Sequence, residues 1–143
     1  MLITKKYMAI TTTFICILAL ATVAQAEGSW TSYITGALTG FDSRTWYDGH
    51  MDHAHTKIRF AGCRDNNYAN DPNDNVTVQL TKEGFFVDKN MGRINFFCWN
   101  SATGDYGEMQ EAGNYHFTVV EINGCTNCSF NISTSNPGVW VSY

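Results

Sequence analysis

The feature that most constrains the fold is a series of short segments in which apolar and polar residues alternate. In NVTVQLTK (75–82), RINFFC (93–98) and TKIRF (56–60), apolar side chains recur at alternate positions. A repeat of two residues places these side chains on one face of a β-strand. By the same pattern, further strands are predicted at Ser32–Leu38, Ser43–Tyr47, Tyr115–Ile122, Ser129–Ser133 and Val139–Tyr143.

Glycine, asparagine and aspartate separate these segments, and no apolar stripe with a 3.6-residue period indicates a helix. Parallel strands would need crossover connections, usually helices, so an antiparallel arrangement is expected. About eight short strands then predict an all-β fold, a small antiparallel β-sandwich or a partly open barrel. No internal repeat or linker is visible, which indicates one domain over residues 27–143.

The N-terminus has the organisation of a secretory signal peptide. Lys5 and Lys6 precede an apolar stretch over residues 8–23, and Ala24 and Ala26 supply the small residues that a signal peptidase requires. Residues 1–26 are therefore predicted to be removed, and the protein to be secreted as an extracellular, bacterial-type product. No later segment is long and apolar enough to predict a membrane span.

The charge of the mature chain narrows the choice of partners. The sequence contains 9 Lys and Arg and 13 Asp and Glu residues, and removing Lys5 and Lys6 leaves a formal charge of −6. Nucleic acids and anionic membranes attract proteins through Lys and Arg. An acidic chain therefore argues against both of these partners.

Four cysteines remain after cleavage, because Cys16 lies within the signal segment. An even number in a small exported domain predicts two disulfides, for which three pairings are possible. We favour Cys63–Cys98 and Cys125–Cys128, because only two residues separate the cysteines of the second pair, beside a turn sequence. Strand-like flanks around this C-x-x-C favour a disulfide at a turn over a catalytic dithiol.

Three histidines precede the strand that ends at Phe60. His53 and His55 are two residues apart, so a strand would place both on one face, and His50 lies in the preceding turn. Imidazoles in this arrangement suit Zn²⁺ or Cu²⁺. The alternative is an exposed hairpin, formed by Ser43–Tyr47 and His53–Phe60, whose histidines bind no metal.

That hairpin interpretation is supported by the charges next to the histidines. Lys57 and Arg59 continue along the same strand face and would repel a cation. We therefore favour the exposed hairpin and keep the metal site as the second interpretation.

The segment RDNNYANDPNDN (64–75) is rich in oxygen ligands of the kind that Ca²⁺ prefers. It lacks the central glycine and final glutamate of a twelve-residue calcium loop. Asn, Asp and Pro also form turns for local backbone reasons. We expect a solvated loop here, with a weak Ca²⁺ site as the minority alternative. The segment TGDYGEMQEAGN (103–114), with Asp105, Glu108 and Glu111, is also expected to be a loop.

Large aromatic side chains suggest a contact surface. Exposed Trp, Tyr and Phe on a β-sandwich can stack on sugars or anchor a protein. Six aromatic residues are not readily placed in a small core, and they form the predicted ligand or partner surface: Trp46, Tyr47, Phe85, Phe86, Phe97 and Trp99.

Three functions follow from these patterns, in order of preference. The first is a secreted non-enzymatic binding protein whose aromatic-edged surface contacts an extracellular protein or a glycan. The second is a secreted metal-binding protein that uses His50, His53 and His55. The third is an extracellular hydrolase, for which the sequence contains no nucleophile motif and no assigned catalytic residue.

Overall fold

A computed structural model describes residues 27–67 and 71–143, so the predicted signal peptide lies outside the described residues. These residues form ten β-strands and no helix. The strands are β1 (Ser29–Ser32), β2 (Trp46–Asp48), β3 (His55–Phe60), β4 (Arg64–Asp65), β5 (Asn75–Lys82), β6 (Lys89–Phe97), β7 (Ala102–Glu108), β8 (Gly113–Ile122), β9 (Ile132–Ser133) and β10 (Val139–Ser142).

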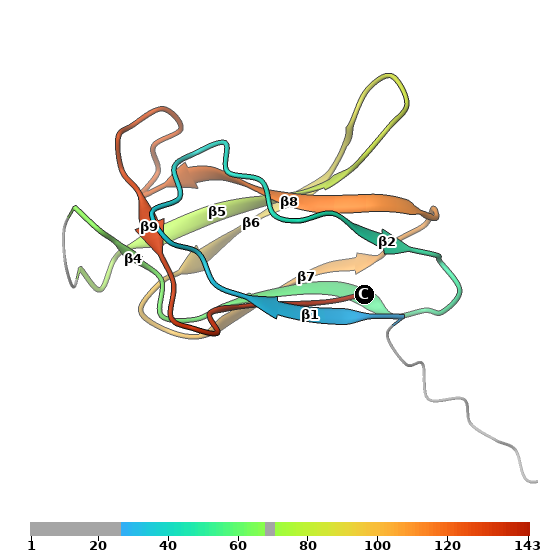
Figure 1. The fold of residues 1–143 in the computed structure, drawn as a ribbon, viewed down its shortest axis with the longest axis horizontal. Coiled ribbons are helices and arrows are strands. Elements are labelled where there is room, and N and C mark those ends of the chain that lie inside the picture. The colour runs from blue at the N-terminus through green and yellow to red at the C-terminus, as the bar shows by residue number, and fades with distance from the viewer. Residues whose placement is uncertain (1–26, 68–70) are drawn as a thin grey trace, which may run out of the picture.

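Two four-stranded antiparallel sheets stack in layers (Figure 1). The first sheet has the strand order β1-β10-β3-β7, and the second has the order β2-β8-β5-β6. The short strands β4 and β9 pair as a third sheet at one end of the stack. The all-β antiparallel sandwich is thus confirmed, and its sheets are not closed into a barrel.

The core lies between the two sheets and follows from the alternation in the sequence. In β3, Ile58 and Phe60 are buried while Lys57 and Arg59 are exposed. The ring of Phe60 packs against Phe96 of the second sheet at a centroid separation of 5.0 Å. To the largest fully buried side chains, the first sheet contributes Ile58 and Phe60, and the second contributes Tyr115, Phe117, Leu80 and Ile122.

Both predicted disulfides are present. Cys63 follows β3 of the first sheet and Cys98 follows β6 of the second, so their bond joins the two layers. Cys125–Cys128 closes a short loop after β8. At the start of this loop, Ile122 and Cys125 exchange backbone hydrogen bonds of 3.0 Å. The alternative pairings are excluded by this connectivity.

The expected hairpin of Ser43–Tyr47 with His53–Phe60 is wrong. β2 pairs with β8 in the second sheet, whereas β3 pairs with β10 and β7 in the first. The segment between β2 and β3 therefore crosses from one layer to the other. The Glu27 carboxylate holds the start of this segment, since it accepts the backbone N–H of Gly49 at 2.6 Å and also that of Met51.

Other strand boundaries also differ from expectation. The predicted strand Ser32–Leu38 is largely a loop, because β1 ends at Ser32 and Ala37 forms only an isolated bridge with Ile132. The expected loop at 103–114 is instead mostly strand, since β7 reaches Glu108 and pairs with β3. This pairing places Asp105 and Glu108 next to the histidines of β3.

A buried polar cluster stabilises the end of the sandwich near β4. Asp65 and Asp74 are almost completely buried, and the side-chain amide of Asn123 donates to both carboxylates, at 3.3 Å and 3.1 Å. The amide oxygen of Asn123 accepts the backbone N–H of Asn75 at 2.8 Å. Buried carboxylates need such donors, because burial without hydrogen bonds is costly.

Candidate ligand-binding face

The outer face of the first sheet aligns polar and aromatic side chains in two rows across its strands. The first row runs Thr31, Trp140, Arg59, Thr103, and the second runs Ser29, Ser142, Lys57, Asp105. The residues of each row are direct cross-strand partners. Because alternate strand residues share a face, the two rows lie side by side. We call this surface the groove face.

The two rows line an open groove of about 290 Å³. Its wall combines two cations, two tryptophans and several hydroxyl groups. Besides Trp30 and Val141, the lining residues are Ser29, Thr31, Lys57, Arg59, Thr103, Trp140 and Ser142.

Arg59 is held in place by its neighbours. Its guanidinium carbon lies 4.4 Å from the centroid of the Trp140 ring, a cation–π arrangement. Its Nε–H donates to the Ser101 hydroxyl at 2.5 Å. This single bond leaves the terminal N–H groups of the guanidinium for a ligand, and those groups bind carboxylate, sulfate or phosphate in a bidentate manner.

The two cations of the groove face form no salt bridge with a described residue, although Asp105 lies next to Lys57 on the neighbouring strand. In the described part of the chain, neither Lys57 nor Arg59 takes part in an ion pair within 4.0 Å. Asp105 is the register partner of Lys57, but its carboxylate accepts the ring Nδ1–H of His55 at 2.9 Å. The groove is therefore a positively charged site on an acidic protein.

Two of the three histidines considered in the sequence analysis, His53 and His55, pair with carboxylates of β7. His53 Nδ1 lies 2.8 Å from Glu108 Oε1, and this hydrogen bond raises the pKa of His53 and lowers that of Glu108. The pKa of Asp105 is lowered, first by its hydrogen bond to His55 and then by that to the Gly107 N–H. The Nδ1 atom of His53 is thus paired with Glu108, and that of His55 with Asp105.

The structure gives no support to the metal interpretation. Over residues 27–67 and 71–143, no group of three or more His, Cys, Asp or Glu side chains is arranged to hold a metal ion. His50 lies in the segment between the sheets, in a left-handed conformation with φ of 52°, and its backbone N–H donates to Asp48 Oδ1 at 2.9 Å. The proposed ligand set of His50, His53 and His55 stays a prediction.

The six aromatic residues predicted as one surface are not brought together. Trp46 is buried in the core, where its ring lies 5.8 Å from that of Trp30, so its assignment to an exposed surface is wrong. Trp46 occupies an inward-facing position of β2, so its indole ring packs between the two sheets. The next residue, Tyr47, points outward and is exposed.

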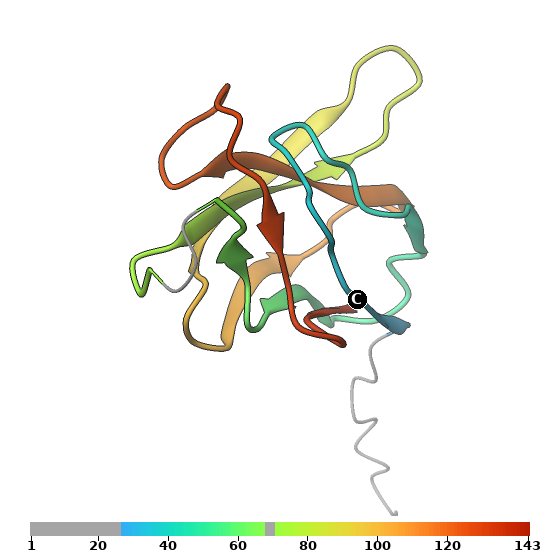
Figure 2. The same cartoon turned by 60° about the vertical axis from the view of Figure 1, so that its left-hand side comes forward.

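The remaining four residues lie at opposite ends of β6. Phe85 and Phe86 are about nine-tenths exposed in the loop between β5 and β6, which projects beyond the sheets in both views (Figures 1 and 2). Phe97 is the last residue of β6, and Trp99 lies two residues after it. Both are exposed, but the length of the strand separates them from the phenylalanine pair.

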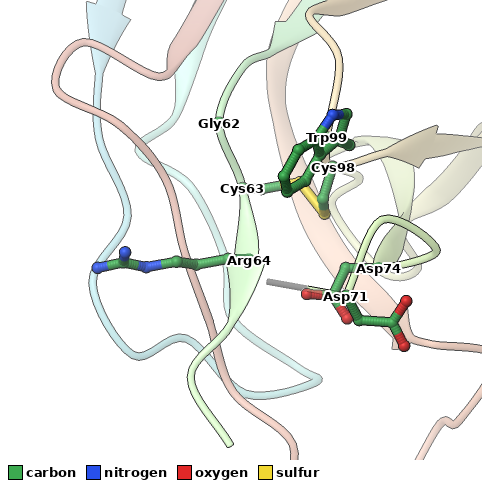
Figure 3. Close-up of a pocket in the computed structure, with 7 residues that line it drawn as sticks. All are labelled: Gly62, Cys63, Arg64, Asp71, Asp74, Cys98 and Trp99. Atoms are coloured by element: carbon green, nitrogen blue, oxygen red, sulfur yellow. A yellow bond between two sulfur atoms is a disulfide. The ribbon is translucent and has the colours of Figure 1, made fainter. Parts of the chain in front are cut away.

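Trp99 borders a second groove, of about 250 Å³, beside the Cys63–Cys98 disulfide (Figure 3). Asp71 and Asp74 line its other side, while the side chain of Arg64 extends away from both carboxylates. Asp74 already accepts hydrogen bonds from the backbone N–H of Asp65 and from Asn123. We therefore assign Asp74 to the buried polar cluster and regard this groove as secondary to the groove face.

Sequence reasoning missed the central residue of the groove face, Trp140. The alternation did place Lys57 and Arg59 on one strand face, but it treated them only as an argument against metal. The missing information was strand order. β10 is the last strand in the chain, and only the tertiary structure places it between β1 and β3.

Comparisons with protein families, with curated proteins and with solved structures found no match to this chain. In the part of the chain that the structure describes, no helix has the length and apolar character needed to cross a bilayer. The site must therefore be interpreted from its own geometry.

Proposed function

We propose that this protein is a secreted, non-enzymatic binding protein, and that the groove face binds an anionic group of its extracellular ligand. The observation that carries the proposal is the position of Arg59 between Trp140, Ser101 and the groove. A guanidinium that is already oriented loses little side-chain freedom when a ligand binds, so more of its interaction energy contributes to affinity.

Secretion is supported by the two disulfides, which form and persist in oxidising compartments. A binding role is supported by the chemistry of the groove, which offers two cations, hydroxyl groups and an indole ring. The histidines pair with carboxylates outside the groove lining, so this site lacks the histidine that many hydrolases use as a base.

The experiment is an NMR titration of the disulfide-bonded protein with sodium sulfate and with glucuronate. We expect chemical-shift changes at the Arg59 side-chain Nε–H and at backbone amides of β3 and β10. Hydrogen bonds to charged groups contribute about 1.5–3 kcal/mol, so Arg59→Ala should weaken binding by roughly 10-fold or more.

Arg93 provides the matched control, because it is another exposed arginine whose Nε–H donates to a neutral acceptor, Gln79 Oε1, at 2.8 Å. Arg93→Ala should leave the affinity within about twofold, since it removes the same net charge from the second sheet. Equal losses for the two variants, or shift changes spread over the whole surface, would mean that anions bind non-specifically and that the groove face is not a site.

A further inference from the structure

The geometry points to an acidic saccharide as the ligand, a carboxylated or sulfated sugar chain that lies across the strands of the groove face. This inference rests on the anion-binding groove proposed above and names the class of ligand. Its three supports are the distribution of hydroxyl side chains, the course of the rows across the sheet, and the small number of cations in the groove.

Hydroxyl side chains lie next to both cations: Thr103 is the cross-strand partner of Arg59, and Ser142 is that of Lys57, whose other cross-strand partner is Asp105. Thr31 and Thr103 are exposed at the two ends of the first row, and Ser29 and Ser142 stand beside Lys57 in the second. Each hydroxyl both donates and accepts hydrogen bonds. Sugar hydroxyls have the same dual capacity, whereas a simple inorganic anion only accepts. The groove therefore has more complementary polar groups than a lone sulfate or phosphate uses.

The rows suit a linear chain. The first row begins on β1 and ends on β7, and both are edge strands of the first sheet. At the usual separation of neighbouring strands, its four positions span about 14 Å. A chain of several sugar rings can thus enter over one edge and leave over the other. In the middle of the row, the guanidinium of Arg59 stacks on the indole of Trp140, and both groups line the groove in which a sugar ring would lie.

Charge limits which polyanion fits. The only unpaired cations of the groove lining are Lys57 and Arg59, and the whole chain has a formal charge of −4. A nucleic acid carries a dense and extended charge that needs many basic contacts. A saccharide with an acid group on some of its rings matches two cations flanked by hydroxyls better than a continuous polyanion does.

The test is isothermal titration calorimetry of the full secreted protein with four probes at one ionic strength. The probes are a sulfated and carboxylated heparin hexasaccharide, an oligogalacturonate, a neutral maltohexaose and poly-glutamate. We expect at least one acidic saccharide to bind at least 10-fold more tightly than both maltohexaose and poly-glutamate. Comparison of heparin with oligogalacturonate then distinguishes sulfate from carboxylate as the recognised group.

Two variants test how the ligand is recognised. Thr31→Val/Thr103→Val removes both hydroxyls of the first row without changing side-chain shape, and should weaken saccharide binding several-fold while sulfate binding is unchanged. Trp140→Ala should weaken saccharide binding by about 10-fold, whereas Trp99→Ala, at the exposed tryptophan of the second groove, should have no effect. Circular dichroism of each variant shows whether the fold is retained.

The outcomes separate this inference from the proposed function. If poly-glutamate binds as tightly as the acidic saccharides, the groove recognises charge alone, and the saccharide inference is wrong while the anion site stands. If the double threonine variant loses nothing, hydroxyl recognition is refuted. If none of the acidic probes and no sulfate binds, both the inference and the proposed function are overturned.

Discussion

Asn123 is the residue whose replacement should most damage the end of the sandwich near β4. Its side-chain amide donates to Asp65 and Asp74, at 3.3 Å and 3.1 Å, and its oxygen accepts from the Asn75 N–H at 2.8 Å. Its φ of 51° places it in the left-handed region, which asparagine tolerates better than most residues. Three variants, to Gly, Ala and Asp, separate these contributions.

The magnitudes follow from the contacts. A hydrogen bond to a charged acceptor contributes about 1.5–3 kcal/mol, and the two here are of ordinary or long length, so Asn123→Gly should cost about 3 kcal/mol of unfolding free energy. Asn123→Ala should cost about 1 kcal/mol more than Asn123→Gly, because alanine is strained at positive φ. Asn123→Asp should be the worst of the three at neutral pH, since it places a third carboxylate against two buried ones.

The assay is urea unfolding followed by tryptophan fluorescence, with Asn100→Ala as the control. Asn100 is exposed and takes part in none of the hydrogen bonds of the described residues, so its replacement should change the free energy of unfolding by less than about 0.5 kcal/mol. The deficit of Asn123→Asp should shrink as pH falls, because protonation removes the repulsion between the carboxylates. An aspartate variant as stable as the glycine variant at neutral pH would refute the assigned role of the amide.

Three further predictions concern the core, the disulfide and the histidine pairs. Thr56→Val should raise the free energy of unfolding by about 1 kcal/mol in the same urea assay, because the fully buried Thr56 hydroxyl has no hydrogen-bond partner among the described residues; a loss of stability would contradict this. Cys63→Ala/Cys98→Ala should lower the free energy of unfolding by about 4 kcal/mol, which is the chain-entropy value for a disulfide with a sequence separation of 35. A loss below about 1 kcal/mol would contradict the idea that this disulfide stabilises the fold by restricting the unfolded chain. In an NMR titration, His53 should titrate above its ordinary pKa of 6.5, and Glu108→Gln should return it toward that value. The pKa of His53 is raised and that of Glu108 is lowered from 4.5, so the contribution of this pair to stability is present between the two pKa values. It is lost as pH rises through the pKa of His53 and as pH falls through that of Glu108. An unchanged His53 titration in Glu108→Gln would exclude the pairing.

Much of the architecture could be predicted because it depends on local patterns. Alternation identified β3 and β5 as strands, and in β3 it also gave the buried side, since a strand that is buried on one face must alternate. Cysteine number and spacing favoured, among three possible pairings, the one that the structure shows. The exposed positions of Tyr47, Phe85, Phe86, Phe97 and Trp99 were also anticipated.

The errors have three separate causes, of which the first is that neighbours in sequence were taken as neighbours in space. β2 and β3 are consecutive strands but belong to different sheets, so the expected hairpin does not form. Trp46 was assigned to the surface because its own segment gives no indication of which face is covered. Asp105 and Glu108 were assigned to a loop, because β7 contains two glycines and few apolar residues.

The sequence by itself determined which residues face inward and outward on several strands, because this depends on short-range spacing, and it favoured one of three disulfide pairings. Only the tertiary structure decided what those outward faces become. Lys57 and Arg59 become part of a candidate binding face because β10 pairs with β3 and β1 pairs with β10, which brings Trp140 and Thr31 into the same row. Such pairing is selected by the burial of the whole core between two sheets, and no local pattern encodes the order of strands that results.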